Sequence, residues 1–502
     1  MTPMDAATTR GSPRVIYLDY GSLQRLFLFL GVVAMGFVPF ARDPVAFGAG
    51  AIMPYALLRI INCPGMPVAV VYLVVWQWAQ TFARILQTFP DGEALGGGLF
   101  GPNVERAYWY MLASVLVLAL SMRMTLGRLP PPPPKDRTAH ARWQPRDLVV
   151  LYFGTLVLSV LVRFSGLATG ALEQPMSALL YVKTLVLFLL FANVLTTKQG
   201  GGFLLVAILI ETVTGFTGIL SDFKAVFIFL ALAAVAVRIP VTLGMGIGAI
   251  VWGGVLVTLA LFWTSVKMEY RAIATGTDDS QAVTASLGDR LGYLGNRALS
   301  PGEIDWNRAS YLLLIRFAYV DIFGSVITVQ EASRDQSVMR QWSDGLAHVL
   351  QPRFLFPNKA PLSDSEVYVR LAKGDPTEEV RAGTSISVGY MAENFVDLGF
   401  PGMLVGIAAI GLMAGCVYRY FMTRKVPIMV REGTVLVLVY SLGRDGVEIS
   451  LPKILGALIM SAGVYAIMVR FAYPRVLAWL EKLPGGGTTL SRAPQPSANR
   501  AA

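Results

Sequence analysis

Cysteine and histidine are scarce in this chain, and charged residues are few. It has two cysteines and two histidines among 502 residues, so neither a disulfide framework nor a histidine-based metal site is predicted. Charged residues make up 15% of the chain, against about 25% in soluble domains. The motifs of phosphate-binding loops, serine hydrolases and zinc proteases are missing as well. These gaps argue against the common soluble enzyme classes.

Apolar residues dominate instead. They form 54% of the chain, and the mean hydropathy is +0.56. Apolar segments near the length that crosses a bilayer recur along it, so we expect an all-α polytopic integral membrane protein with about twelve transmembrane helices. The segments are Leu26–Phe40, Phe47–Ile61, Val68–Phe89, Ala107–Met122, Leu148–Val162, Met176–Leu195, Phe203–Phe216, Ala225–Val237, Val241–Trp263, Met403–Phe421, Thr434–Leu442 and Ile454–Phe471.

One long polar interruption divides the chain. Residues 1–263 are predicted to form an N-terminal transmembrane region of about nine helices, and residues 264–400 one large loop that contains short helices. Residues 401–472 return to transmembrane helices. Residues 473–502 form a tail whose Gly-, Ser- and Pro-rich end is predicted to be disordered.

Lys and Arg predict the orientation. They collect before the first apolar segment, after the fourth, as at Arg128 and Arg137, and after the tenth, as at Arg424. Basic loops remain in the cytoplasm, so both termini are predicted to be cytoplasmic and residues 264–400 to lie outside. The net charge of +10 is interpreted as this bias and not as nucleic-acid binding.

The polar loop contains helical patterns of its own. Trp306–Thr328 is predicted to be a helix lying in the membrane interface, and Ser333–Leu350 a second, amphipathic helix. A short helix is predicted to end at Leu398, with Ser385 or Ser387 as its N-cap.

Three polar residues share one face of that short helix. Tyr390, Glu393 and Asp397 stand at positions i, i+3 and i+7. Two acids facing the basic residues of the loop indicate either a structural ion network or a general base beside an anion-binding site. Glu211, inside an apolar segment, indicates either a functional group or an interhelical hydrogen bond.

Cations suited to a pyrophosphate occur in and near the loop. The planar fork of arginine bonds phosphate oxygens in pairs, and several arginines near a bilayer favour a lipid-linked phosphate. Acids and bases at the outer ends of other segments, such as Glu448, lie on the same predicted side. The candidate pyrophosphate-binding residues are Arg353, Arg316, Arg381, Lys224 and Lys359.

Four short motifs carry a resemblance to a known family. Pro352–Pro361, Gly383–Ser387, Gly389–Glu393 and Leu398–Gly402 resemble the Wzy-type oligosaccharide repeat-unit polymerases, which make O-antigen and exopolysaccharide and are related to the O-antigen ligases. The resemblance is sharpest from Arg353 to Gly402, and its motifs are loose.

The resemblance implies a multi-pass glycosyltransferase of the bacterial inner membrane. Such an enzyme polymerises undecaprenyl-diphosphate-linked oligosaccharides at the periplasmic face. The expected partners are that lipid-linked substrate and the bilayer, with a chain-length regulator and a flippase of the same pathway as candidates. No metal, other cofactor or nucleic acid is expected. Glu393 is predicted to be the general base, with Asp397 as the alternative, and Tyr390 to position the sugar.

Other functions stay open. A ligase would carry a histidine near residues 388–390, where this chain has none; the Ser221–Lys224 segment does resemble a ligase motif. A lipid-sugar flippase would place its charges inside several spans, whereas most charges here lie in the loop and at segment ends. A third alternative is a non-catalytic scaffold of a polysaccharide export complex.

Overall fold

The fold is known from a computed structural model of the chain. It describes residues 16–97, 101–127, 129–165, 173–217, 223–275, 285–333, 339–351, 355–356, 359, 363–373, 386–443 and 446–482. Helices fill most of these residues, and the described ranges contain no β-strand beyond one isolated bridge between Tyr17 and Pro240.

The helices follow one another along the chain in three stretches. The first stretch contains α1 (Tyr20–Met35), α2 (Pro44–Ile61), α3 (Ala69–Asp91), α4 (Asn103–Leu126), α5 (Pro134–Arg137) and α6 (Pro145–Phe164). The second contains α7 (Glu173–Leu180), α8 (Val182–Thr197), α9 (Gly201–Thr217), α10 (Ala225–Ala236), α11 (Leu243–Thr275), α12 (Leu287–Leu299), α13 (Trp306–Phe317) and α14 (Val320–Ser333). The third contains α15 (Gln341–Leu350), α16 (Asp364–Tyr368), α18 (Tyr390–Met422), α19 (Ile428–Gly443), α20 (Leu451–Gly456), α21 (Ala462–Ile467) and α22 (Tyr473–Lys482).

Short 3-10 and π-helical turns connect or flank several of these helices. The 3-10 turns are η1 (Val38–Phe40), η2 (Leu95–Gly97), η3 (Ala139–Arg142), η5 (Pro301–Glu303) and η8 (Gly446–Glu448). The π-helical turns are η7 (Val369–Lys373), η9 (Ala457–Ser461) and η10 (Met468–Ala472), and the last two join α20, α21 and α22 into one helical run.

The apolar segments of the sequence all fall on helices. Among the described residues, eight helices are long and apolar enough to cross a membrane, or up to nine if α13 and α14 count together as one bent span. The apolar helices α1, α9 and α10 are shorter. The chain is therefore an all-helical, multi-pass membrane protein in its described parts, and the count of about twelve spans stays a prediction.

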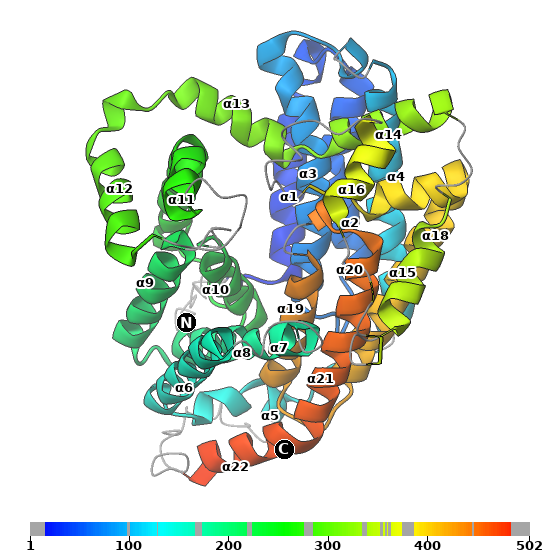
Figure 1. Cartoon of the computed structure of the whole chain (residues 1–502). Coiled ribbons are helices and arrows are strands. Elements are labelled where there is room, and N and C mark those ends of the chain that lie inside the picture. Colours follow the sequence, from blue (N-terminus) through cyan, green and yellow to red (C-terminus); the bar gives the residue numbers. More distant parts are fainter. Residues whose placement is uncertain are drawn as a thin grey trace, which may run out of the picture.

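The helices pack in two groups. α1–α4 pack with α14 and α18 in the first group, and α6 packs with α8, α9 and α10 in the second. α19 lies between them and contacts both α3 and α8. In Figure 1 the first group is at the right and the second at the left, and α13 crosses from α11 to α3 above the space between them. The end of the molecule at which this crossing occurs is called the α13 end.

A small hydrophobic core, separate from the main one, lies between α11, α12 and the residues just before α10. Phe223, Trp263, Val266, Tyr270 and Leu294 bury apolar surface there. This packing fixes the last turns of α11, which continue as helix beyond Thr264, where the sequence predicted the loop to begin. The main core, by contrast, runs through both groups.

The predicted interfacial helix Trp306–Thr328 is wrong as a single element. It is broken into α13 and α14, which are bent by 54° relative to each other. The break follows Phe317, where Ala318 adopts an extended conformation and the Tyr319 N–H reaches the carbonyl of Gln80 on α3. α14 then buries an apolar face against α4, with Gly324 close to Val104.

The helix predicted over Ser333–Leu350 also differs. Ser333 belongs to the end of α14, and α15 begins only at Gln341, with residues 334–338 outside the described ranges. α15 packs alongside α18 and α20 (Figure 1).

The short helix that carries Glu393 is the first part of α18. Its N-cap is Gly389 and not Ser385 or Ser387, since the Ser387 hydroxyl accepts a hydrogen bond from the Gly389 N–H instead. The predicted end at Leu398 is confirmed by Gly399 and Phe400, which leave helical geometry before Pro401 starts the apolar part of α18. At the other end of the chain, the tail predicted from residue 473 begins as helix α22, and residues 483–502 lie outside the described ranges.

Candidate functional site

A line of polar side chains runs along one face of α3. They recur at intervals of three and four residues, so they face the same way. All of them are buried within a helix apolar enough to span a membrane. Polar groups in such a place are costly unless they find partners. The line consists of Gln77, Gln80, Thr81, Arg84, Gln87 and Thr88.

Gln77, Gln80 and Arg84 find their partners in the loop and in the last third of the chain, whereas Thr81 and Thr88 donate to carbonyls of α3 itself. The Tyr390 hydroxyl donates to Gln77 Oε1 at 2.7 Å. Arg84 Nε donates to the carboxylate of Asp321, 2.9 Å away. The polar face of α3 thus fixes the start of α18 and the start of α14 in place.

Gln80 attaches the η8 turn to the same face. The Val447 N–H donates to Gln80 Oε1 at 2.9 Å, and Gln80 Nε2 approaches Glu448 Oε1 at 3.4 Å. Gly446 has φ +68°, and a Cβ there would lie 1.7 Å from Gln80 Oε1. Gly389 has φ +83°, and a Cβ there would lie 2.2 Å from the Val447 carbonyl oxygen. Glycine at both positions lets η8 lie directly between α3 and α18.

Four basic side chains gather beside this turn. Lys224 Nζ lies 4.8 Å from the ring centre of Trp76, the residue before Gln77 on α3. Lys267 and Arg271 stand one helical turn apart on α11, and the charge of Arg316 on α13 acts on both. We call Lys224, Lys267, Arg271 and Arg316 the basic cluster.

The basic cluster joins the two helix groups at the α13 end. α10 and α11 supply Lys224, Lys267 and Arg271, and α13 carries Arg316 from α11 across to α3 (Figure 1). Lys267 is 8% exposed, and the nearby charges of Arg316 and Arg271 repel it while Glu448 attracts it. Like charges assembled at a partly buried place are unfavourable unless an anion neutralises them. The cluster therefore has the electrostatic character of an anion-binding site.

Trp76 contacts Lys224 of the basic cluster and Phe317, the residue that follows Arg316. Its ring contacts Phe317 edge-on, with centroids 5.0 Å apart, and stacks with Tyr72. Its indole Nε1 is buried and has no hydrogen-bond partner among the described residues. A buried N–H donor without an acceptor carries a free-energy penalty that a bound acceptor would relieve.

Glu393 lies deeper, on the α18 side of η8. It is 1% exposed, and its Oε2 accepts a hydrogen bond from the Leu451 N–H at the first residue of α20. Tyr390, one turn earlier, is also buried and donates to Gln77. The negative charges of Asp364 and Asp397 repel an ionised Glu393 carboxylate, whereas the positive charge of Lys453 attracts it.

Asp364 belongs to the same carboxylate region. It accepts hydrogen bonds from the Ser450 hydroxyl at 3.0 Å and from Lys453 Nζ. The hydroxyl of Tyr319 lies in the break between α13 and α14. The negative charges of Glu448, Asp364 and Glu393 all act on it, and that of Glu448 acts most strongly. Glu448 is thus the carboxylate at the boundary between the basic cluster and the buried acids.

Asp397 has a different neighbour from Glu393, although the two share a helix face. Its two oxygens accept hydrogen bonds from the Gln341 and Trp342 N–H groups, at 2.9 and 2.8 Å, which begin α15. The Trp342 indole also donates to Asn394 Oδ1 at 2.9 Å. Acids at a helix N-terminus satisfy donors that the helix leaves unpaired. Asp397 therefore holds α15 against α18.

Lys359 is placed at the opposite end of α15. Its ammonium donates to the carbonyl oxygens of His348 and Gln351, the latter at 2.9 Å. Those carbonyls close the C-terminal end of the helix, where a cation is favourable. The structure thus brings Lys224 and Arg316 into the basic cluster but places Lys359 apart from it. Arg353 and Arg381 lie outside the described residues.

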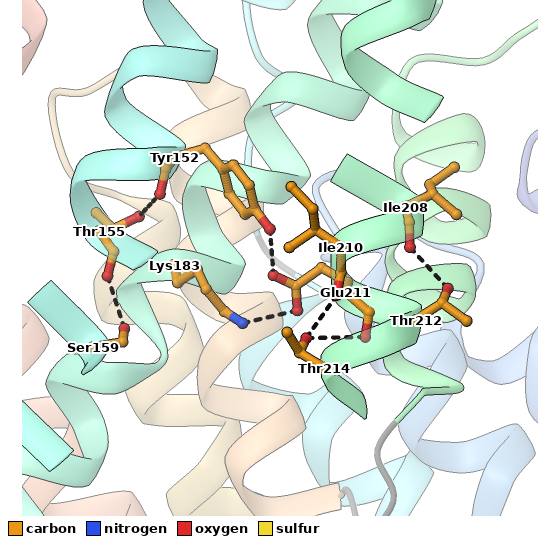
Figure 2. A network of polar contacts seen from close by, with 9 residues as sticks. All are labelled: Tyr152, Thr155, Ser159, Lys183, Ile208, Ile210, Glu211, Thr212 and Thr214. Atoms are coloured by element: carbon orange, nitrogen blue, oxygen red, sulfur yellow. Dashed lines mark hydrogen bonds and ion pairs between the residues drawn. The ribbon is translucent and has the colours of Figure 1, made fainter. Parts of the chain in front are cut away.

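The contacts of Glu211 confirm the predicted interhelical hydrogen bond. Its carboxylate accepts hydrogen bonds from the Tyr152 hydroxyl on α6 at 2.6 Å and from Lys183 Nζ on α8 at 2.8 Å, as Figure 2 shows. This interhelical network holds α6, α8 and α9 together within the second group. It does not contribute to the basic cluster.

Sequence reasoning missed two members of the basic cluster and the polar face of α3. Lys267 and Arg271 follow the ninth apolar segment and fall within the predicted loop of residues 264–400, although their spacing of four residues continues the helix of that span. The glutamines of α3 lie in a segment whose mean hydropathy is that of a membrane span, so the average does not reveal them. A search for polar residues with a helical period inside apolar segments would have found them.

No family model, curated protein or solved structure matches the chain. Its function must therefore be inferred from the site.

Proposed function

We propose that the protein is a membrane glycosyltransferase that polymerises undecaprenyl-diphosphate-linked oligosaccharide repeat units into O-antigen or exopolysaccharide, at the periplasmic face of a bacterial inner membrane. The observation that carries this proposal is the basic cluster. It joins Lys224, Lys267, Arg271 and Arg316 at one end of a bundle of membrane helices.

A lipid-linked diphosphate fits this position better than a free anion. The cluster lies where α10, α11 and α13 meet at the ends of apolar helices. A diphosphate attached to a membrane lipid remains at that depth, while its sugar extends from the bilayer. The tryptophan ring beside Lys224 adds an aromatic surface of the kind that stacks on sugars, and its unpaired indole N–H can donate to a phosphate or sugar oxygen.

In the proposed reaction the cations act on the leaving group. When the anomeric carbon of the growing chain separates from the diphosphate, negative charge develops on the phosphate oxygens, and fixed cations stabilise that charge most in the transition state. Lys224 and Arg316 take this role as the sequence predicted, and Lys267 and Arg271 join them. Arg353 and Arg381, outside the described residues, remain predictions for the same role. For Lys359 the contact with α15 favours a structural role.

Analysis of lipid-linked glycans tests the proposed function. A strain in which the gene is deleted should accumulate single repeat units on the lipid carrier and lack long polymer, and the wild-type gene should restore it. Mass spectrometry of the lipid-linked fraction measures both. Unchanged polymer length in the deletion strain would reject the proposal.

Two arginines on α13 provide a matched pair for the anion site. Arg316 lies in the basic cluster, whereas Arg308, two helical repeats earlier, is exposed, and its backbone N–H donates to Asp305. Arg316→Ala should lower the polymerisation rate by about 10²-fold. Arg308→Ala should leave it near the wild-type rate, and equal losses for both would show that α13 matters only as a structural element.

A lipid-sugar flippase is the second candidate, because polar groups do occur inside the membrane helices. The polar face of α3 and the Lys183–Glu211 ion pair are the relevant observations. Against this function, Gln77, Arg84 and Lys183 are each held by a fixed partner, namely Tyr390, Asp321 and Glu211. Loss of a flippase would leave the single repeat units on the cytoplasmic leaflet, whereas loss of a polymerase would leave them accessible to a periplasmic glycosidase.

A further inference from the structure

The carboxylate nearest the basic cluster is not the one that the sequence favours as general base. Glu393 and Tyr390 are both buried behind η8, and Glu393 is 1% exposed. Its carboxylate already accepts the Leu451 N–H. An acceptor hydroxyl on a sugar is bulky, and a general base must come within hydrogen-bond reach of it, about 2.6–3.2 Å. Glu393 is therefore out of reach of a sugar hydroxyl in this conformation.

A general base must be accessible to the acceptor sugar and close to the basic cluster, and Glu448 meets both requirements. It is partly exposed, and it lies in the η8 turn beside the basic cluster, where it attracts Lys267. The base and the leaving group act on opposite sides of one anomeric carbon, so the base must lie close to the cations that hold the diphosphate.

The position of Glu448 is fixed by its surroundings. Gln80, which is 2% exposed, contacts both the Glu448 carboxylate and the Val447 N–H through the two ends of one amide. Gly446 and Gly389 allow the turn to approach α3 and α18 more closely than any other residue would permit. A catalytic group held on a rigid turn by a buried hydrogen bond is positioned before substrate binds.

We propose that Glu448 is the general base of the site, which rests on the proposed glycosyl transfer. The acceptor hydroxyl oxygen forms a bond to the anomeric carbon of the donor sugar, and its proton passes to the Glu448 carboxylate. The bond between that carbon and the diphosphate oxygen breaks, and its electron pair leaves with the lipid diphosphate, whose charge the basic cluster stabilises. Glu393 then serves as a structural residue that joins α18 to α20.

Two amide variants distinguish the acids. In proteoliposomes supplied with lipid-linked repeat units, Glu448→Gln should polymerise at least about 10²-fold more slowly than wild type while binding of the lipid-linked substrate is retained. Glu393→Gln should stay within about threefold, because an amide oxygen still accepts the Leu451 N–H. The reverse pattern would overturn the proposal and assign the base to Glu393.

Chemical rescue separates a base from a structural carboxylate. With Glu448→Ala, added formate should restore the rate by at least about tenfold, because a small carboxylate can occupy the vacated space and take the proton. Glu393→Ala should show no rescue. Absence of rescue in Glu448→Ala, in protein that elutes as a single folded species and still binds substrate, would count against Glu448.

The same assay separates failure of the inference from failure of the proposed function. If wild-type protein makes no polymer from lipid-linked units, the glycosyltransferase proposal itself fails. If wild type polymerises and Glu448→Gln does so at the same rate, only the assignment of Glu448 fails.

Discussion

Gly446→Ala should damage the site more than a single added methyl group suggests. Gly446 has φ +68°, a left-handed conformation that costs a residue with a Cβ about 1 kcal/mol. The new Cβ would also lie 1.7 Å from Gln80 Oε1 and 2.8 Å from Trp76 Cδ1. One of these groups must move, and the Val447–Gln80 hydrogen bond would be lost with a buried donor left unpaired, at about 1–3 kcal/mol.

A second glycine isolates the backbone contribution. Gly101 has φ +58°, but a Cβ there would meet nothing within 4 Å. Gly101→Ala should therefore destabilise the protein by about 1 kcal/mol, and Gly446→Ala by about 2–4 kcal/mol. Because η8 also carries Glu448, only Gly446→Ala should lower polymerisation.

Thermal stability in detergent, followed by fluorescence-detected size-exclusion chromatography, compares the two variants, and the proteoliposome assay compares their activity. Equal stabilities and equal activities for Gly446→Ala and Gly101→Ala would refute the close packing of η8 against α3. A loss of stability in Gly446→Ala without a loss of activity would separate the packing from the site.

Three further predictions concern other parts of the chain. Asp321→Ala should lower stability by about 2 kcal/mol because Arg84 is left buried without its partner, and adding Arg84→Met should restore part of the apparent melting temperature. Burial lowers the pKa of His140 from 6.5 to about 4, so the unfolded chain binds the proton at a higher pH than the folded chain. The contribution of His140 to stability should be full above about pH 6.5 and should fall by about 3 kcal/mol as the pH approaches 4. In thermal melts, His140→Gln should remove this pH dependence. In a cysteine-free background, a cysteine at Asp279 should react with an impermeant thiol reagent in intact spheroplasts and one at Arg137 should not, and the opposite labelling would reverse the predicted orientation.

The sequence by itself determined where the long apolar helices are, although not the helices of the polar loop. Apolar segments such as Val68–Phe89 become helices because burial of apolar side chains and closure of backbone hydrogen bonds are local requirements of a membrane segment. Gly399 and Pro401 likewise predicted the interruption of α18, since left-handed geometry and a missing N–H act on the residues that carry them. The shared face of Glu393 and Asp397 follows from helical spacing alone.

Only the tertiary structure decided which polar groups meet. Lys224, Lys267 and Arg316 come from three helices, and helical periodicity within each says nothing about how the three pack. Glu393 and Asp397 share a face, yet one accepts an N–H at the start of α20 and the other accepts N–H groups at the start of α15, because those helices approach α18 from separate parts of the chain. Contacts of this kind depend on helix packing over long sequence distances, and a local pattern does not contain that information.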